Sequence, residues 1–164
     1  MSSPGKLIRS DDSQILSFSR SLAFPVEEVW QAFMHPEAFK SWLMKGHFDE
    51  AVGGKIEMKY KRTGYTAKGI ITKIKQNALL DHTWEDENVQ GSTVHWKFNP
   101  GANNTCILIL EHTFHPSYEL SLLAAGWHLH LDLFTASLEG KEEQWSWETW
   151  ESLNAEYEKA FQVL

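Results

Sequence analysis

The feature that most constrains the fold is a repeated alternation between apolar and polar residues with a period of two. Such alternation is typical of strands that turn one face to a core and the other to solvent. Short connections rich in Gly, Asn and Pro separate the alternating segments, which predicts an antiparallel meander. The segments are residues 14–24, 55–60, 66–74, 78–85, 92–98 and 105–113.

Two short stretches with a helical period interrupt these strands. Residues 26–33 place apolar side chains at positions i, i+3, i+4 and i+7 directly after Pro25, which is typical of a short amphipathic helix. The pair His35-Pro36 ends this helix, and apolar residues between 39 and 43 indicate a second one. We therefore expect two short helices after the first strand.

The segment AAGWHLHLDLFTASLEG, residues 124–140, can be interpreted in two ways. With a period of two it is a strand that presents two histidines and an aspartate on one face, as a metal site might. With a period of 3.6 it belongs to a helix that accounts for every position from 117 to 139, far more than the strand does. We therefore predict a long helix over 117–139, with Ser117 as its N-cap and Gly140 following its end.

The helical interpretation gives the two histidines different surroundings, because residues two apart on a helix point about 200° away from each other. His128 then lies one turn from Asp132 on the solvent-facing side. His130 lies in the apolar arc, where burial should lower its pKa. Gly126, in the middle of the helix, should mark its closest approach to the sheet.

Composition narrows the classes of function. The 164 residues carry a net charge of −7, which argues against nucleic acid, because phosphate binding depends on Lys and Arg. The single cysteine, Cys106, leaves no partner for an internal disulfide. No stretch approaches the ~20 apolar residues of a membrane-spanning helix, so we expect a soluble, cytoplasmic protein without membrane contact. Eight Trp and nine Phe must be buried or line a binding site.

The order of these elements predicts an α+β fold in which a curved antiparallel sheet of about six to seven strands surrounds a long C-terminal helix. Residues 1–13 are polar and should form a flexible N-terminus before a single domain over residues 14–140. Residues 141–164 carry a helical stripe of apolar side chains among glutamates. This amphipathic extension should pack on the domain or at a homodimer interface.

Seven short motifs add a family resemblance over residues 17–138. In this order they resemble the landmarks of the activator of heat-shock protein 90 ATPase homologue-like (AHSA-type) family. The resemblance implies the helix-grip fold of the START-related, birch-pollen-allergen-like (SRPBCC) superfamily, and it implies a chaperone as a partner. The motifs are FPVEEVWQAF, HPEAFKSW, FDEAVGGKIEM, KGIITKI, LLDHTW, LILEH and AAGWHLHLDLF.

The inward faces of the strands and of the long helix together suggest a binding site. In the strand 105–113 we expect Leu110 and His112, rather than Ile107 and Ile109, to face inward. A mostly apolar interior with a few polar groups is typical of small-molecule pockets, whereas the alternative is a filled core in which each histidine bonds a neighbour. Three histidines directed into one interior favour the pocket. The candidate ligand-binding residues are Trp42, His82, Trp84, Trp96, Leu110, His112, Leu123, Trp127, His130 and Phe134.

We expect a non-enzymatic protein that holds a small apolar or aromatic molecule between sheet and helix, without a cofactor. One alternative is a co-chaperone-like module that stimulates an ATPase, and another is a polyketide cyclase- or aromatase-like enzyme that uses the pocket histidines. A metal site at His112 and His115 lacks the usual zinc signatures, and Cys106 lies in an apolar strand, where thiols are inert. We therefore predict neither a metal site nor a catalytic residue.

Overall fold

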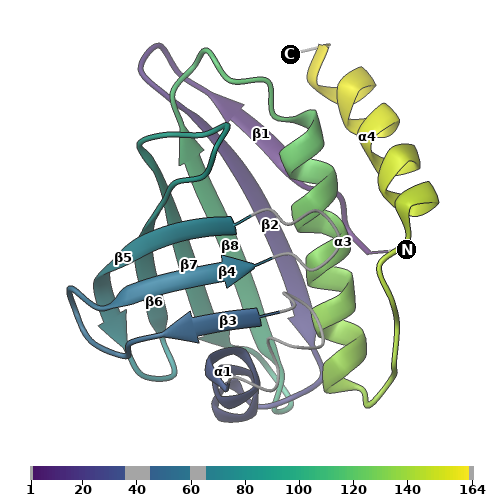
Figure 1. Cartoon of the computed structure of the whole chain (residues 1–164). Helices are drawn as coiled ribbons and strands as arrows, with labels where there is room; N and C mark the ends of the chain where they lie inside the picture. Colours follow the sequence, from purple (N-terminus) through teal and green to yellow (C-terminus); the bar gives the residue numbers. More distant parts are fainter. Residues whose placement is uncertain (1, 36–44, 60–65, 163–164) are drawn as a thin grey trace.

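The computed structural model describes residues 2–35, 45–59 and 66–162. Within these ranges, eight strands form one antiparallel sheet in the order β1-β2-β8-β7-β6-β5-β4-β3, and this sheet curves around α3 (Figure 1). The predicted α+β helix-grip fold is therefore confirmed. The strands are β1 (Lys6–Arg9), β2 (Gln14–Leu22), β3 (Lys45–Phe48), β4 (Lys55–Lys59), β5 (Thr66–Lys75), β6 (Leu79–Trp84), β7 (Ser92–Pro100) and β8 (Cys106–Phe114).

Strand β1 corrects the expectation of a flexible N-terminus over residues 1–13. Residues 6–9 pair antiparallel with β2 at the edge of the sheet. Only Leu7 of this short strand is buried, so the sequence carries almost no alternation to detect. The backbone N–H of Gly5 also donates a hydrogen bond of 2.7 Å to the hydroxyl of Tyr157, far along the chain. The N-terminal segment is thus held by partners that are distant in sequence.

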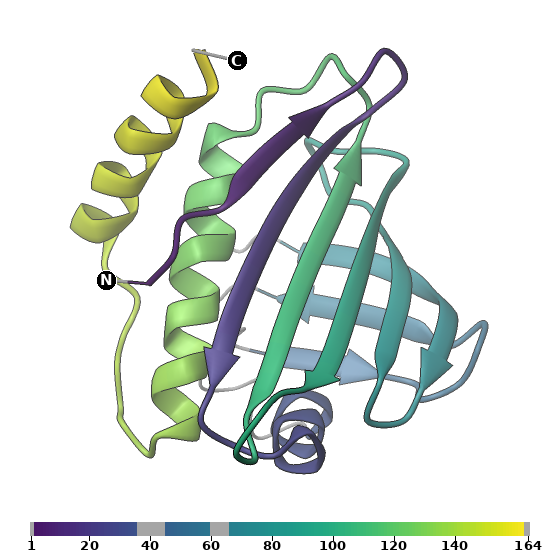
Figure 2. The same ribbon diagram turned by 180° about the vertical axis from the view of Figure 1, so that it is seen from behind.

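Three helices lie in the described ranges: α1 (Val26–Met34), α3 (Ser121–Leu138) and α4 (Trp147–Gln162). Helix α1 covers one end of the sheet, and α3 crosses its concave face (Figure 2). The second short helix predicted near residues 39–43 lies outside the described residues, as does the candidate residue Trp42. None of the three described helices is both long enough and apolar enough to span a membrane.

The long helix is confirmed, but its predicted start at Ser117 is wrong. The Ser117 hydroxyl lies 2.8 Å from Nδ1 of His115, within a turn that precedes α3. The buried side-chain amide of Gln14 donates hydrogen bonds to three backbone carbonyls in residues 115–118. Because these bonds fix the turn, the helix begins four residues later, at Ser121.

Helix α4 packs against α3 on the side that is turned away from the sheet (Figures 1 and 2). Its buried residues are Tyr157 and Phe161. Gly126, which we expected to face the sheet, faces α4 instead, because a Cβ atom there would lie 3.9 Å from Nε1 of Trp150. The apolar stripe of the C-terminal extension is thus used within the chain.

His128 is buried, with 7% of its surface exposed, so its predicted position on the solvent side is wrong. The Tyr157 hydroxyl accepts from the N-terminal segment and donates to Nδ1 of His128 at 2.8 Å. Nε2 of His128 lies 2.7 Å from Oγ of Ser2, and Asp132 forms an ion pair of 3.2 Å with the buried Arg20. The N-terminal segment and α4 cover the face of α3 that the helical pattern alone predicts to be exposed to solvent.

The substitution Tyr157→Phe should lower the free energy of unfolding by about 2 kcal/mol, because it leaves Nδ1 of His128 and the N–H of Gly5 without their partner. Urea denaturation followed by circular dichroism measures this loss. Tyr118→Phe is the matched control, since its hydroxyl accepts a single, exposed hydrogen bond from Gln90. A loss no larger than that of the control would contradict the role of Tyr157.

Candidate functional site

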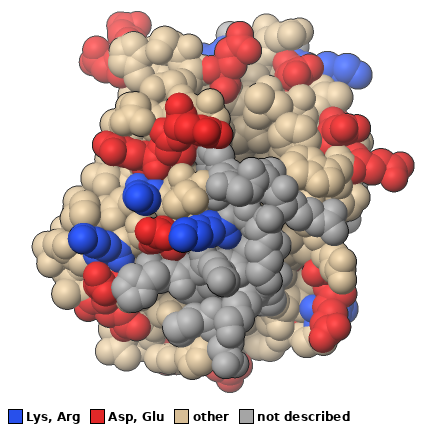
Figure 3. Space-filling model, viewed as in Figure 1, with Lys and Arg blue, Asp and Glu red and all other residues tan. Residues whose placement is uncertain are grey.

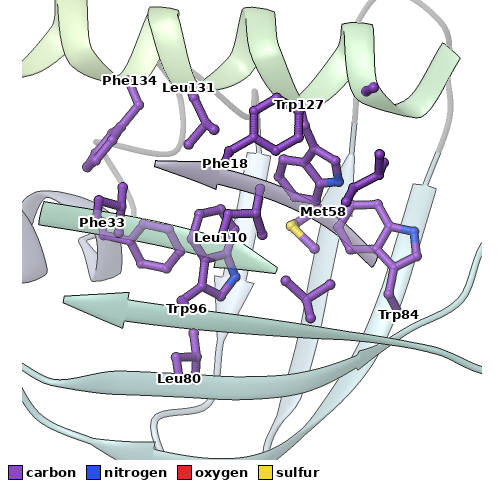
Figure 4. Close-up of a cluster of buried hydrophobic side chains, with 14 of the residues drawn as sticks. Phe18, Phe33, Met58, Leu80, Trp84, Trp96, Leu110, Trp127, Leu131 and Phe134 are labelled. Atoms are coloured by element: carbon purple, nitrogen blue, oxygen red, sulfur yellow. The ribbon is translucent and has the colours of Figure 1, made fainter. Parts of the chain in front are cut away.

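Three tryptophans occupy the centre of the interior between the sheet and α3. Trp84 comes from β6, Trp96 from β7 and Trp127 from α3, and all three are buried. The ring centroid of Trp127 lies 5.2 Å from that of Trp84 and 5.5 Å from that of Trp96 (Figure 4). These are tilted and edge-to-face contacts, the arrangements that aromatic pairs prefer. The three rings form one aromatic cluster that joins the helix to the sheet.

The pairing register of the strands aligns the inward-facing residues of neighbouring strands across the sheet. Leu80, Trp96, Leu110 and Phe18 lie opposite one another in β6, β7, β8 and β2. The even-numbered residues of β8 are all buried, whereas Ile107 is 37% exposed. The inward face that we favoured for the strand 105–113 is therefore confirmed.

A second aromatic group lies where α1 meets the end of α3. Phe134 is fully buried, and its ring centroid lies 6.0 Å from that of Phe33 in α1. Phe33 in turn lies 4.7 Å from Trp96, so both groups belong to one continuous interior (Figure 4). Leu123 is only partly buried and packs against the margin of this core.

His82 joins Trp96 to the backbone of its own strand. Nε1 of Trp96 donates a hydrogen bond of 3.1 Å to Nε2 of His82, and Nδ1 of His82 donates to the carbonyl of Thr83 at 2.8 Å. An indole nitrogen can only donate, so Nε2 of this histidine must be unprotonated. His82 is thereby fixed as the neutral Nδ1–H tautomer.

His112 is held in the opposite tautomer. Nε1 of Trp127 donates to Nδ1 of His112 at 3.0 Å, so the proton of this imidazole is on Nε2. Nε2 then donates to Oγ of Ser92 at 2.9 Å, and the Ser92 hydroxyl donates to the carbonyl of Trp84. Two histidines of opposite tautomer thus connect the aromatic cluster to the sheet.

Burial keeps both of these histidines neutral. Desolvation lowers the pKa of His82 to about 4, and it lowers the pKa of His112 well below 6.5, with a smaller contribution from the nearby His82. Protonation would also place an imidazolium N–H against an indole N–H. Since both ring nitrogens of each histidine are bonded within the protein, neither histidine is free to exchange a proton with a bound molecule.

The third indole N–H has a partner that the sequence analysis missed. Nε1 of Trp84 donates to Oδ2 of the buried Asp86 at 2.9 Å. The other carboxylate oxygen accepts from the backbone N–H groups of Asn88 and Val89, as Asp often does in a turn. The sequence analysis assigned no role to Asp86, although an Asp two residues after a core Trp is the signal that could have identified it.

His130 is buried but lies apart from the two strand histidines. Its Nδ1 donates to the carbonyl of Gly126 at 2.7 Å, and its ring centroid lies 4.8 Å from that of Trp145, in the segment between α3 and α4. Burial lowers the pKa of His130 to about 4. The three histidines that we expected in one interior therefore form a pair, His82 and His112, and a separate residue, His130. In the described part of the chain, no three His, Cys, Asp or Glu residues form a group that could hold a metal ion.

A curved sheet that grips a long helix over an aromatic interior defines the class of this fold. The family model described as Activator of Hsp90 ATPase homolog 1-like protein matches residues 23–139, from just before α1 to the end of α3. The chain belongs to this family. A search among curated protein sequences finds no match.

Solved structures resemble the chain over a longer span than the family model does. CalU16 from Micromonospora echinospora is 22% identical, with a TM-score of 0.76 over 98% of this chain and 94% of its own. EF2215 from Enterococcus faecalis, a conserved protein of unknown function, is 12% identical, with a TM-score of 0.80 over 98% and 91%. DynU16, a protein in the dynemicin biosynthetic locus, is 22% identical, with a TM-score of 0.69 over 83% and 51%. At these identities the likeness shows the fold alone. The matches to CalU16 and EF2215 cover 98% of this chain and therefore include α4.

Proposed function

We propose that this protein binds a small apolar or aromatic molecule in the interior between the sheet and α3, without turning it over. The observation that carries the proposal is the aromatic cluster of Trp84, Trp96 and Trp127, linked by the neutral His82 and His112. Large flat apolar surfaces with a few fixed polar groups are the usual lining of small-molecule sites. The family match supports the proposal through the fold, and a cytoplasmic location is part of it.

The proposal further assigns ligand contact to the residues that surround this cluster. Leu110 and Phe134 are buried beside it, and Leu123 lies at its margin. The bonded state of the two histidines argues against acid–base chemistry by these groups, and it is also what the filled-core alternative predicts, so the binding role depends on the probe titration below. Ligand contact by Trp42 and His130 remains part of the prediction from sequence.

Titration with the apolar fluorescent probe anilinonaphthalene sulfonate tests the proposal. We expect saturable binding at one site and quenching of part of the tryptophan emission, because the three indoles of the aromatic cluster are buried in the interior. The variant Trp127→Phe should lose part of this quenching, and Trp147→Phe, which changes an indole that is 40% exposed, should retain it. Non-saturating binding with unchanged emission would contradict the proposal. Native mass spectrometry of the freshly purified protein would identify a molecule that co-purifies.

A second candidate function is carried by the family match itself. The description of the family names an activator of the Hsp90 ATPase, so a chaperone-interacting module is the alternative role. Addition of this protein to the purified chaperone, with ATP hydrolysis as the readout, tests it. Stimulation that persists in a variant unable to bind the fluorescent probe would separate the two functions.

A further inference from the structure

One flank of α4 stays exposed although the helix packs on α3. Trp147, Glu151 and Glu158 are spaced at i, i+4 and i+11, which places them in one line along the helix. All three side chains are exposed, and Trp147 is exposed to 40%. Asn154 continues the line and donates a hydrogen bond of 3.0 Å to Glu158. At 1.5 Å per residue, the line is about 16 Å long.

The first turns of α3 lie beside α4 (Figure 1). Gly126 faces Trp150 of α4, and Leu122, one turn earlier on α3, is 53% exposed. Glu119 precedes Leu122 by three residues and lines, together with Glu158, a groove of about 470 Å³. We call this surface the α3–α4 seam, and its residues are Glu119, Leu122, Trp147, Glu151 and Glu158.

The charge of the seam is negative. It contains three carboxylates, and acidic side chains are exposed where α4 lies, as they are at several other places on this face (Figure 3). Arg9 also lines the groove, where its guanidinium donates to the carbonyl of Phe161 at 3.1 Å. The seam thus combines two exposed apolar side chains with a row of carboxylates, which is the chemical complement of a basic amphipathic segment.

We propose that the α3–α4 seam docks a basic amphipathic segment of a partner protein, about three helical turns long. Lysines or arginines of the segment pair with the carboxylates, and its apolar residues rest on Trp147 and Leu122. Tryptophan is the strongest aromatic partner for a cation and is enriched among the residues that dominate binding energies. An anionic membrane would be repelled by the same carboxylates, and a second copy of the chain would place like charges together.

A fluorescein-labelled peptide of leucine and lysine, arranged to be amphipathic as a three-turn helix, is the probe. Fluorescence anisotropy should show saturable binding that weakens as the salt concentration rises. A peptide in which every lysine is replaced by glutamate should not bind. Equal binding of the two peptides, or no binding of the lysine peptide at low salt, would overturn the proposal.

Matched variants locate the binding on the seam. Trp147→Ala should weaken binding by about tenfold or more, as loss of a central aromatic contact does. Glu151→Gln combined with Glu158→Gln should weaken binding by about fivefold and reduce its salt dependence. Glu87→Gln combined with Glu156→Gln makes the same change of charge away from the seam, with Glu156 on the opposite flank of α4, and should leave binding unchanged.

Three results would overturn the assignment to this surface and partner. If the Glu87/Glu156 control variant lost as much peptide binding as the seam variant, the binding would depend on net charge and not on the seam. Light scattering that shows a dimer, abolished by Trp147→Ala, would assign the seam to a second copy of this chain. Binding to vesicles of phosphatidylcholine and phosphatidylglycerol, abolished by the same substitution, would assign it to a membrane.

Thermal melts of each variant serve as the folding control. Melting temperatures within a few degrees of the parent confirm that the fold is retained.

Discussion

Lowering the pH from about 7.5 to about 5 is expected to reduce the free energy of unfolding by about 6 kcal/mol. The cause is that His82 and His130 have pKa values of about 4 in the folded protein and that of His112 lies well below 6.5. In the unfolded chain all three titrate near 6.5, so below this pH the unfolded state binds more protons. The stabilisation is present above pH 6.5 and is lost as the pH falls toward about 4. At pH 5 each histidine accounts for about 2 kcal/mol.

Urea denaturation at the two pH values measures this loss. The variant His82→Gln removes one of the three titrating groups, so the difference between the two pH values should shrink by about 2 kcal/mol. An unaltered pH dependence in the His82 variant would show that this histidine is already protonated in the folded protein near pH 5.

Most of the fold could be predicted from the sequence because its strands have one buried and one exposed face. The residues 105–113 illustrate this, since the alternating burial of β8 follows the pattern of the residues. The long helix was equally accessible, because its pattern extends over many more positions than a strand accounts for. Strand β1 carries only one buried residue, and pairing with β2 stabilises it without a sequence pattern of its own.

The sequence predicted burial better than it predicted partners. The burial and lowered pKa of His130 followed from its helical position, whereas its neighbour Trp145 belongs to a segment with no fixed geometry in the sequence. His128 shows the opposite failure, because its helical position suggested solvent and two distant segments cover it. Helical spacing assigns a side chain to one face of its own helix, and tertiary packing decides what lies against that face.

The sequence predicted which side chains of the candidate site face inward, but it did not predict their hydrogen-bond partners. Alternation placed Trp84, Trp96 and His112 on the inner face of the sheet, where the structure has them. The pairing of each indole with a particular acceptor depends on strand register, which a single sequence does not fix. The buried carboxylate of Asp86 was missed for a different reason, because no role was assigned to the residues after β6 although Asp86 lies only two residues after Trp84.

The substitution Trp127→Ala is expected to be among the most destabilising single changes in this protein, with a loss of about 4 kcal/mol in the free energy of unfolding. Trp127 contacts the rings of both strand tryptophans and donates to His112, so its removal leaves a large cavity and an unpaired buried nitrogen. Trp127→Phe keeps an aromatic ring but not the hydrogen bond, and should cost about 2 kcal/mol. Guanidinium denaturation at neutral pH measures both losses. Trp147→Ala makes the same chemical change at an exposed site and should cost less than about 1 kcal/mol, so equal losses at the two positions would show that Trp127 is not the centre of the core.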